Sequence, residues 1–144
     1  MVTADHGMAP VDPKKTFYLN KECPALASFL KKNKSGDLLT PAGSCRDYFL
    51  HIKEESLNEA FAYLTDALQG KAEVWKVSDL ISEGLFGSHV SPRFLERVGN
   101  LAILPYGGEA IWWYEKHKFE QHFYGAHGGL TREELEIPFL FLSL

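Results

Sequence analysis

The amino-acid sequence predicts an α/β protein in which two terminal strand segments enclose a mixed α+β middle segment. Helix-like and strand-like patterns alternate along the 144 residues, and a strand–helix–strand succession covers residues 48–77. Short runs of apolar or small residues stand at both ends, and we expect residues 2–8 and 139–142 to be strands of a larger parallel sheet. With 45% hydrophobic residues, the chain is long enough to bury one ordinary core.

The elements that follow the N-terminal segment are short. Residues 16–19 form an apolar run of β-type residues, which predicts a strand or an extended piece. Pro24 suits the first turn of a helix that runs to Leu30, and the Ser-Gly-Asp sequence at residues 35–37 stops it. Apolar residues then alternate with mixed ones over residues 48–53, which predicts a strand with one apolar face.

The clearest helical pattern covers residues 57–68. Ser56 stands at the N-cap position with Glu59 three positions later, which is the capping-box spacing. Apolar residues then recur on one helical face, and Gly70 closes the helix. Residues 72–77 predict the strand that completes the strand–helix–strand unit.

A second set of elements follows this unit. The pattern predicts a short helix over residues 78–83, a glycine-bearing turn over residues 84–87 and a further helix that begins at Ser91-Pro92. Residues 101–104 form an apolar strand, and the Tyr-Gly-Gly sequence at residues 106–108 predicts a turn.

The C-terminal third is predicted to contain a hairpin and one helical turn. Residues 111–114 and 119–124 are strand candidates joined by a charged turn, so a hairpin is the simplest arrangement. Thr131 and the glutamate three positions later have the capping-box spacing. Pro138 ends that turn before residues 139–142, an apolar stretch suited to a buried strand.

Composition excludes several classes of protein. The net charge of −4 gives no basic footprint for a nucleic-acid polymer, and the lysine-rich residues 31–34 indicate a solvated helix end. No apolar run reaches the roughly 20 residues that span a bilayer. Cys23 and Cys45 have no metal-site or redox spacing, so we expect two ordinary thiols and no cysteine nucleophile.

Two histidine motifs near the ends of the chain have the character of metal-site corners. Asp5-His6-Gly7 follows a short strand-like run, and His127-Gly128-Gly129 follows Gly125-Ala126. In each motif a glycine lets the backbone approach a ligand closely, and carboxylate oxygen with imidazole nitrogen is a donor mixture that suits zinc or manganese. We expect His51, His89, His117 and His122 to have no metal role.

These motifs, taken with Thr3-Ala4 before the first and Leu130-Thr131 and Ile137-Pro138 after the second, resemble the type I phosphodiesterase/nucleotide pyrophosphatase family of the alkaline phosphatase superfamily. Residues 41–47 and 100–105 resemble its prokaryotic branch. The resemblance implies the C-terminal part of an alkaline-phosphatase-like α/β/α sandwich. Residues 1–13 and 124–144 would belong to the catalytic core, and residues 14–123 would form an α+β insert, or cap subdomain.

The resemblance also implies a site. Enzymes of this family hold two divalent metal ions, usually zinc, around a threonine or serine nucleophile. By resemblance Asp5 and His6 bind one metal and His127 binds the other. The nucleophile and the remaining ligands lie upstream of the first motif, so the partner of this chain would be the N-terminal remainder of the same protein. The substrate would be a small phosphoester or nucleotide, and the isolated chain would be inactive.

Several alternatives stay open. Arg46 has the planar fork that contacts a phosphate, or it forms a surface ion pair with Asp47 or Glu54. The same superfamily also offers phosphomonoester hydrolysis and phosphoglycerate-mutase-type transfer. A binding module without catalysis is the third alternative, because no nucleophile can be assigned within the chain.

Overall fold

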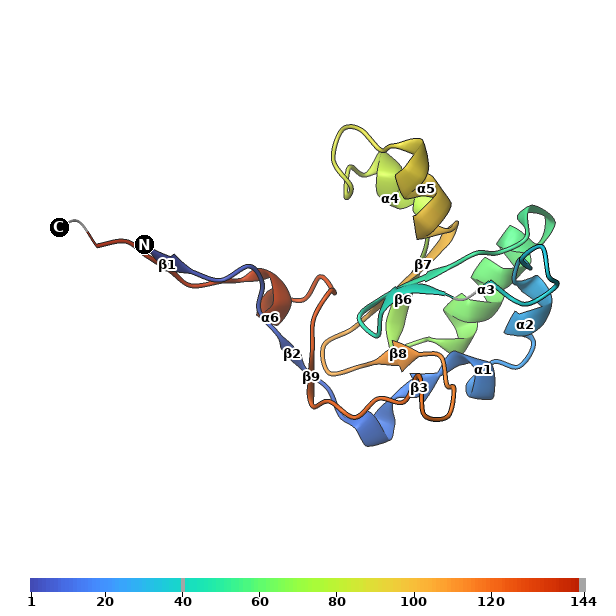
Figure 1. Ribbon diagram of the computed structural model, residues 1–144, viewed down its shortest axis with the longest axis horizontal. Coiled ribbons are helices and arrows are strands. Elements are labelled where there is room, and N and C mark those ends of the chain that lie inside the picture. Colours follow the sequence, from blue (N-terminus) through green and yellow to red (C-terminus); the bar gives the residue numbers. More distant parts are fainter. Residues whose placement is uncertain (40, 143–144) are drawn as a thin grey trace.

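The structure, a computed structural model, describes residues 1–39 and 41–142. Figure 1 shows a body built around a β-sheet and a long, narrow arm that ends at the two termini. Among the described residues, no helix is long and apolar enough to cross a membrane.

The body is organised by one four-stranded sheet. Its strands, in spatial order, are β4 (Ala42–Ser44), β5 (Asp47–Leu50), β7 (Leu101–Pro105) and β6 (Ala72–Lys76). All neighbouring pairs are antiparallel. The predicted strand–helix–strand unit is present as β5, α3 (Leu57–Ala67) and β6. However, β7 lies between the two strands, so β5 and β6 run in the same direction without pairing.

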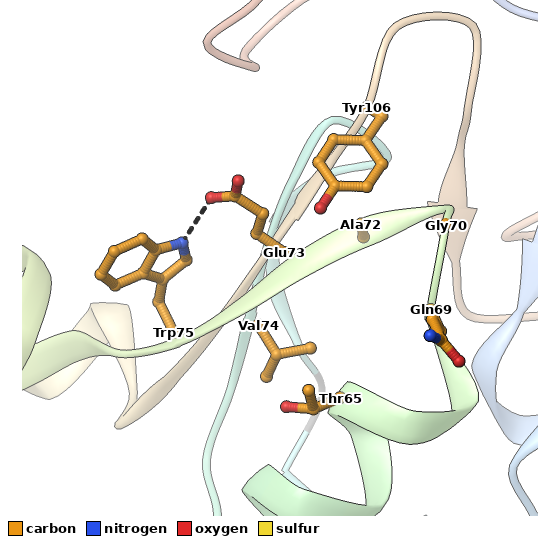
Figure 2. Close-up of a pocket in the computed structure, with 8 residues that line it drawn as sticks. All are labelled: Thr65, Gln69, Gly70, Ala72, Glu73, Val74, Trp75 and Tyr106. Carbon is orange, nitrogen blue, oxygen red and sulfur yellow. Dashed lines mark hydrogen bonds between the residues drawn. The ribbon is translucent and has the colours of Figure 1, made fainter.

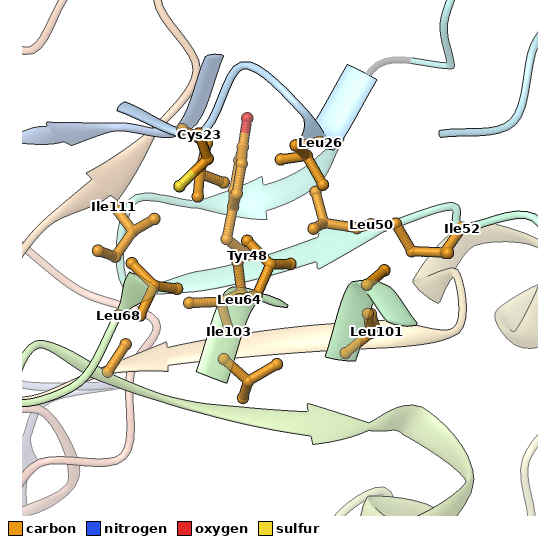
Figure 3. Close-up of a cluster of buried hydrophobic side chains, with 14 of the residues drawn as sticks. Cys23, Leu26, Tyr48, Leu50, Ile52, Leu64, Leu68, Leu101, Ile103 and Ile111 are labelled. Carbon is orange, nitrogen blue, oxygen red and sulfur yellow. The ribbon is translucent and has the colours of Figure 1, made fainter. Parts of the chain in front are cut away.

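Side chains from the two faces of β7 enter two different hydrophobic clusters. Leu101 and Ile103 enter the larger cluster with residues of α3, whereas Ala102 and Leu104 enter a smaller one with residues of α4 (Val77–Ser82) and α5 (Pro92–Val98). A strand buried on both sides has no polar face, which explains the uninterrupted apolar run. The larger cluster, drawn in Figure 3, includes Cys23, Leu26, Tyr48, Leu50, Ile52, Leu64, Leu68, Leu101, Ile103 and Ile111.

Two of the predicted helix starts are confirmed. Ser91 accepts a hydrogen bond from the backbone N–H of Phe94 at 3.2 Å, and α5 begins with Pro92 as its first residue. The Thr131 capping box forms at the start of α6 (Arg132–Leu135). These starts depend on contacts within a few residues, so a local pattern identifies them correctly.

Two other helix predictions are wrong in detail. The Ser56 side chain makes no capping bond, because Glu54–Ser56 form a 3₁₀ turn ahead of α3. The helix expected between Pro24 and Leu30 is reduced to α2 (Leu26–Phe29), which follows α1 (Leu19–Glu22). Leu30 instead forms an isolated bridge with Ile52, which extends the edge of the core.

The predicted hairpin over residues 111–124 is also wrong. Strand β8 (Ile111–Trp112) pairs in parallel with β3 (Phe17–Tyr18). Of the hairpin, an isolated antiparallel bridge between Glu115 and Phe119 forms, and residues 119–124 contain no extended strand. The side chain of Asn20 donates to the carbonyl oxygen of Tyr114 at 2.9 Å and accepts from its N–H at 2.8 Å. These bonds use the backbone groups that a hairpin partner would need.

The arm is made of two short antiparallel pairs. Strand β1 (Val2–Thr3) pairs with β10 (Phe139–Leu140), and β2 (Ala9–Pro10) pairs with β9 (Gly125–Ala126). The expected terminal strands therefore exist, but they pair with each other in opposite directions rather than in parallel. Figure 1 shows the segments around residues 2–3 and 139–140 running side by side along the arm. The division into residues 1–13, 124–144 and 14–123 stays a prediction.

Candidate metal centre

Two histidines from opposite ends of the sequence lie face to face on the arm. The ring centroids of His6 and His127 are 3.9 Å apart, and the ring planes are inclined by 19°. The antiparallel pairing of Ala9 with Ala126 brings the segments that carry them together. Both histidines are exposed. The two sequence motifs thus meet in the fold.

The carboxylate of Asp5 lies beside this pair. Its Oδ2 atom is 3.7 Å from Nε2 of His6, and its Oδ1 atom accepts a hydrogen bond from the His6 backbone N–H at 3.0 Å. Backbone hydrogen bonds, together with the imidazole of His6, lower the pKa of Asp5 below its ordinary value. Nδ1 of His6 is 2.8 Å from the Gly7 carbonyl oxygen, which assigns the proton to Nδ1 and leaves Nε2 free to bind a ligand.

The donor chemistry of Asp5, His6 and His127 fits a divalent metal ion such as zinc. One carboxylate and two imidazoles are exposed at the same surface. In residues 1–39 and 41–142, however, no three His, Cys, Asp or Glu side chains are arranged to surround a single ion. A metal site here would need further ligands to complete its coordination.

The turn between β4 and β5 fixes the backbone of His127. Oγ of Ser44 donates to the His127 carbonyl oxygen at 3.0 Å, and the carboxylate of Asp47 accepts from the Ser44 backbone N–H at 2.9 Å. Gly128 has a φ of 113°, and a Cβ atom there would lie 2.7 Å from Oδ1 of Asp47. The backbone conformation therefore favours glycine beside His127, and any other residue would also displace the Asp47 side chain.

Arg46 lies inside the protein, where it binds other protein groups. Its guanidinium group is fully buried, and its Nε and Nη2 atoms donate to the two carboxylate oxygens of Glu134 at 3.0 and 2.9 Å. Its Nη1 atom donates to the carbonyl oxygens of Tyr106 and Glu109. All three nitrogens are thus engaged by protein oxygens, so the expected phosphate contact does not fit the structure. The expected surface ion pair is likewise replaced by this buried one.

Glu134 connects the segments that carry the two candidate histidines. Its carboxylate accepts the backbone N–H of Gly129 at 2.9 Å and the hydroxyl of Thr131 at 2.7 Å. Its backbone carbonyl oxygen accepts the N–H of Gly7 at 2.9 Å. The sequence identifies Glu134 only as a helix-capping residue, because no local pattern indicates its distant partner, Arg46.

The environment of Glu134 makes the fold sensitive to acid. Burial alone would raise its pKa, but hydrogen bonds from Arg46, Thr131 and the Gly129 N–H outweigh burial and lower the pKa from 4.5 to about 2. The folded state thus favours the ionised form of Glu134. The stabilisation of the fold by this carboxylate is therefore complete above pH 4.5 and is lost as the pH falls toward 2. We expect protonation of the Glu134 carboxylate to lower the free energy of unfolding by about 3 kcal/mol as the pH falls from 4.5 to about 2.

A carbon-13 NMR titration of the Glu134 carboxyl measures its pKa directly, and urea unfolding at a series of acidic pH values measures the stability. The Thr131→Val variant removes one hydrogen-bond donor, so its Glu134 should titrate at a higher pH than in the original chain. A Glu134 carboxyl with an ordinary pKa in the folded protein would contradict this account.

The two cysteines and the other histidines lie apart from the stacked pair of His6 and His127. Cys23 and Cys45 are free, buried thiols, and burial raises the pKa of both, which disfavours the thiolate form that attacks a substrate. His122 is exposed, with Nε2 3.9 Å from the carboxylate of Glu120. Within the described part of the chain, none of the remaining histidines joins a group of three metal-ligating side chains.

A pocket of about 290 Å³ lies over β6. Figure 2 shows the residues that line it. Its lining consists of Thr65, Gln69, Gly70, Ala72, Glu73, Val74, Trp75 and Tyr106. The carboxylate of Glu73 accepts a hydrogen bond from the indole N–H of Trp75 at 2.8 Å. The lining contains no histidine or cysteine, so this pocket offers no comparable set of metal ligands.

Comparison with known proteins shows a likeness of fold. No protein-family model matches the chain, and no curated protein matches it. Human ectonucleotide pyrophosphatase/phosphodiesterase 5 is 18% identical with a TM-score of 0.59, over 92% of this chain and 30% of that one. The murine protein is 19% identical with a TM-score of 0.62, over 94% of this chain and 31% of that one. An inactive variant of the murine protein in complex with AMP gives the same values.

The likeness covers nearly all of this chain, which spans about 30% of the length of those structures. The resemblance identified from the sequence is therefore confirmed at the level of the fold. The expected α/β class, as part of an alkaline-phosphatase-like architecture, is confirmed with it.

Proposed function

We propose that this chain supplies three ligands to the two-metal site of a phosphodiesterase or nucleotide pyrophosphatase. The observation that carries the proposal is the stacking of His6 on His127, with the carboxylate of Asp5 beside them. The likeness of fold to two nucleotide pyrophosphatase/phosphodiesterase structures supports it. Asp5 and His6 would bind one ion and His127 the other, with zinc the expected metal and manganese the alternative.

The chemistry explains why such ligands are needed. Hydrolysis of a phosphodiester develops negative charge on the attacking and leaving oxygens, and two divalent ions about 4 Å apart stabilise both and activate a hydroxyl nucleophile. The chain's own residues hold the ligands in place. The Gly7 carbonyl orients the His6 ring so that Nε2 is free, and Ser44 fixes the backbone of His127.

The threonine or serine nucleophile and the remaining ligands would come from a segment N-terminal to Asp5 in a longer protein. The 144-residue chain by itself would then be inactive. The substrate would be a small phosphoester or nucleotide rather than a nucleic-acid polymer.

Metal content and substrate preference test this proposal together. The protein at its natural length should retain zinc or manganese through purification, and it should hydrolyse bis(para-nitrophenyl) phosphate faster than para-nitrophenyl phosphate. A chelator should abolish the activity, and zinc should restore it. Faster hydrolysis of the monoester would favour the phosphomonoesterase or mutase-type alternative. A protein that takes up no metal would favour the binding module without catalysis.

A further inference from the structure

The two stacked histidines share one support, and His127 has a second support of its own. Glu134 accepts the backbone N–H groups of Gly7 and Gly129, each at 2.9 Å, and these glycines lie within two residues of the histidines. The hydroxyl of Ser44 donates to the carbonyl oxygen of His127 at 3.0 Å. In the described part of the chain, no hydrogen bond joins the β4–β5 turn to residues 5–7. The Ser44 contact therefore belongs to one histidine alone.

Groups of the β4–β5 turn hold the Ser44 hydroxyl in place. Ser44 and Asp47 are opposite each other in the register of β4 and β5, so only Cys45 and Arg46 connect the two strands. The carboxylate of Asp47 accepts the backbone N–H of Ser44 at 2.9 Å and also contacts its hydroxyl. The same hydroxyl oxygen accepts the backbone N–H of Arg46 at 3.1 Å. The group that binds the His127 carbonyl is thus oriented before the arm reaches it.

The two central residues of this turn anchor it in the body of the protein. The guanidinium group of Arg46 is fully buried and donates to the carbonyl oxygens of Tyr106 and Glu109. The carbonyl oxygen of Cys45 accepts the backbone N–H of Ile111 at 3.0 Å. The turn is therefore part of the body, although the histidine that it contacts lies on the arm.

Gly128 allows the arm and the turn to approach closely. A Cβ atom at Gly128 would lie 2.8 Å from Oγ of Ser44 and 2.7 Å from Oδ1 of Asp47, which is closer than a side chain can come without displacing them. Since Gly128 follows His127 directly, this close approach places the His127 carbonyl within reach of the Ser44 hydroxyl. The contact is thus built from both sides, by a glycine on the arm and a hydroxyl on the turn.

We propose that Ser44 is a positioning residue for only one of the two metal ions, the ion that His127 would bind. This inference rests on the function proposed above and deepens it. The Ser44 hydroxyl fixes the backbone from which the His127 imidazole projects, and groups that orient a metal ligand typically change metal affinity by about tenfold to a hundredfold. Because the hydroxyl does not reach His6, its loss should weaken one ion and spare the other.

Calorimetric titration of the metal-free protein at its natural length with zinc tests this proposal without turnover. The unaltered protein should bind two zinc ions. Ser44→Ala should weaken the binding of one ion by about tenfold and leave the other unchanged, whereas Ser44→Thr retains the hydroxyl and should bind both ions normally. Ser28→Ala is the matched control, because it removes a hydroxyl on α2 that also donates to a backbone carbonyl, that of Ala25 at 2.7 Å. It should leave both affinities unchanged.

The His127→Ala background identifies the ion that Ser44 serves. In that background only the ion bound by Asp5 and His6 should remain, and adding Ser44→Ala should have no further effect on its affinity. General damage to the arm would instead weaken the remaining ion as well.

The results separate this inference from the proposed function. Equal weakening of both ions by Ser44→Ala, or normal binding of both, would overturn the assignment of Ser44 while leaving the metal-site proposal intact. A Ser44→Ala effect that persists in the His127→Ala background would also overturn it. Failure of the unaltered protein to bind two zinc ions would overturn the proposed function, and this inference with it.

Discussion

In the protein at its natural length, replacing His127 by alanine is expected to lower kcat/KM for bis(para-nitrophenyl) phosphate by about a thousandfold or more. Under the proposed function, the variant loses one ligand of a metal ion whose charge would stabilise the transition state. Asp5→Ala should give a loss of similar size. The fold should be retained, because both side chains are exposed and neither enters a hydrophobic cluster. Thermal unfolding and metal content, measured on the same samples, separate loss of the metal from loss of the fold.

His122→Ala is the matched control for this experiment. His122 is also exposed and lies five positions before His127, but it faces Glu120 rather than the stacked pair. The activity and metal content of the His122→Ala protein should therefore stay close to those of the original protein. Near-normal turnover in His127→Ala, with the protein folded, would remove the basis for the proposed metal site.

The sequence located the candidate ligands but not what positions them. Asp5, His6 and His127 stand in short motifs with adjacent glycines, and such local patterns can be identified along one stretch of chain. Arg46 and Glu134 are 88 positions apart, and nothing near either one indicates the other. The sequence therefore leaves Arg46 open between a phosphate contact and a surface ion pair, whereas its buried guanidinium group is bound by Glu134 and two backbone carbonyls.

The fold shows the same difference: features set by neighbouring residues can be predicted from the sequence, and contacts between distant segments cannot. The apolar run of β7 and the Ser91 cap of α5 were predictable, because burial preference and capping are properties of a few adjacent residues. Strand partners were not predictable. The same β-type pattern over Ile111–Trp112 is compatible with a hairpin and with the parallel pairing to β3. Asn20 occupies the backbone N–H and carbonyl of Tyr114, so antiparallel pairing does not extend beyond the single bridge between Glu115 and Phe119.

Replacing Arg46 by methionine is expected to reduce the free energy of unfolding by about 3–5 kcal/mol. Methionine approximates the length of arginine, but the variant leaves the carboxylate of Glu134 buried without its cation. Urea unfolding at neutral pH, followed by circular dichroism, measures the loss. Arg132→Met is the matched control, because Arg132, the first residue of α6, forms an exposed ion pair with Glu136, the residue that follows this helix. That change should cost no more than about 0.5 kcal/mol.

The Arg46 variant also tests whether the buried Arg46–Glu134 pair positions the proposed metal ligands. The Glu134 carboxylate holds the N–H of Gly129, two residues after His127, and its backbone oxygen holds the N–H of Gly7, next to His6. If the pair positions both histidines, Arg46→Met should weaken zinc binding even at temperatures where the protein remains folded. A variant that is destabilised but binds zinc normally would limit the pair to a role in stability. Unchanged stability would instead show that the surrounding polar groups compensate for the lost cation, against the expectation for a broken buried ion pair.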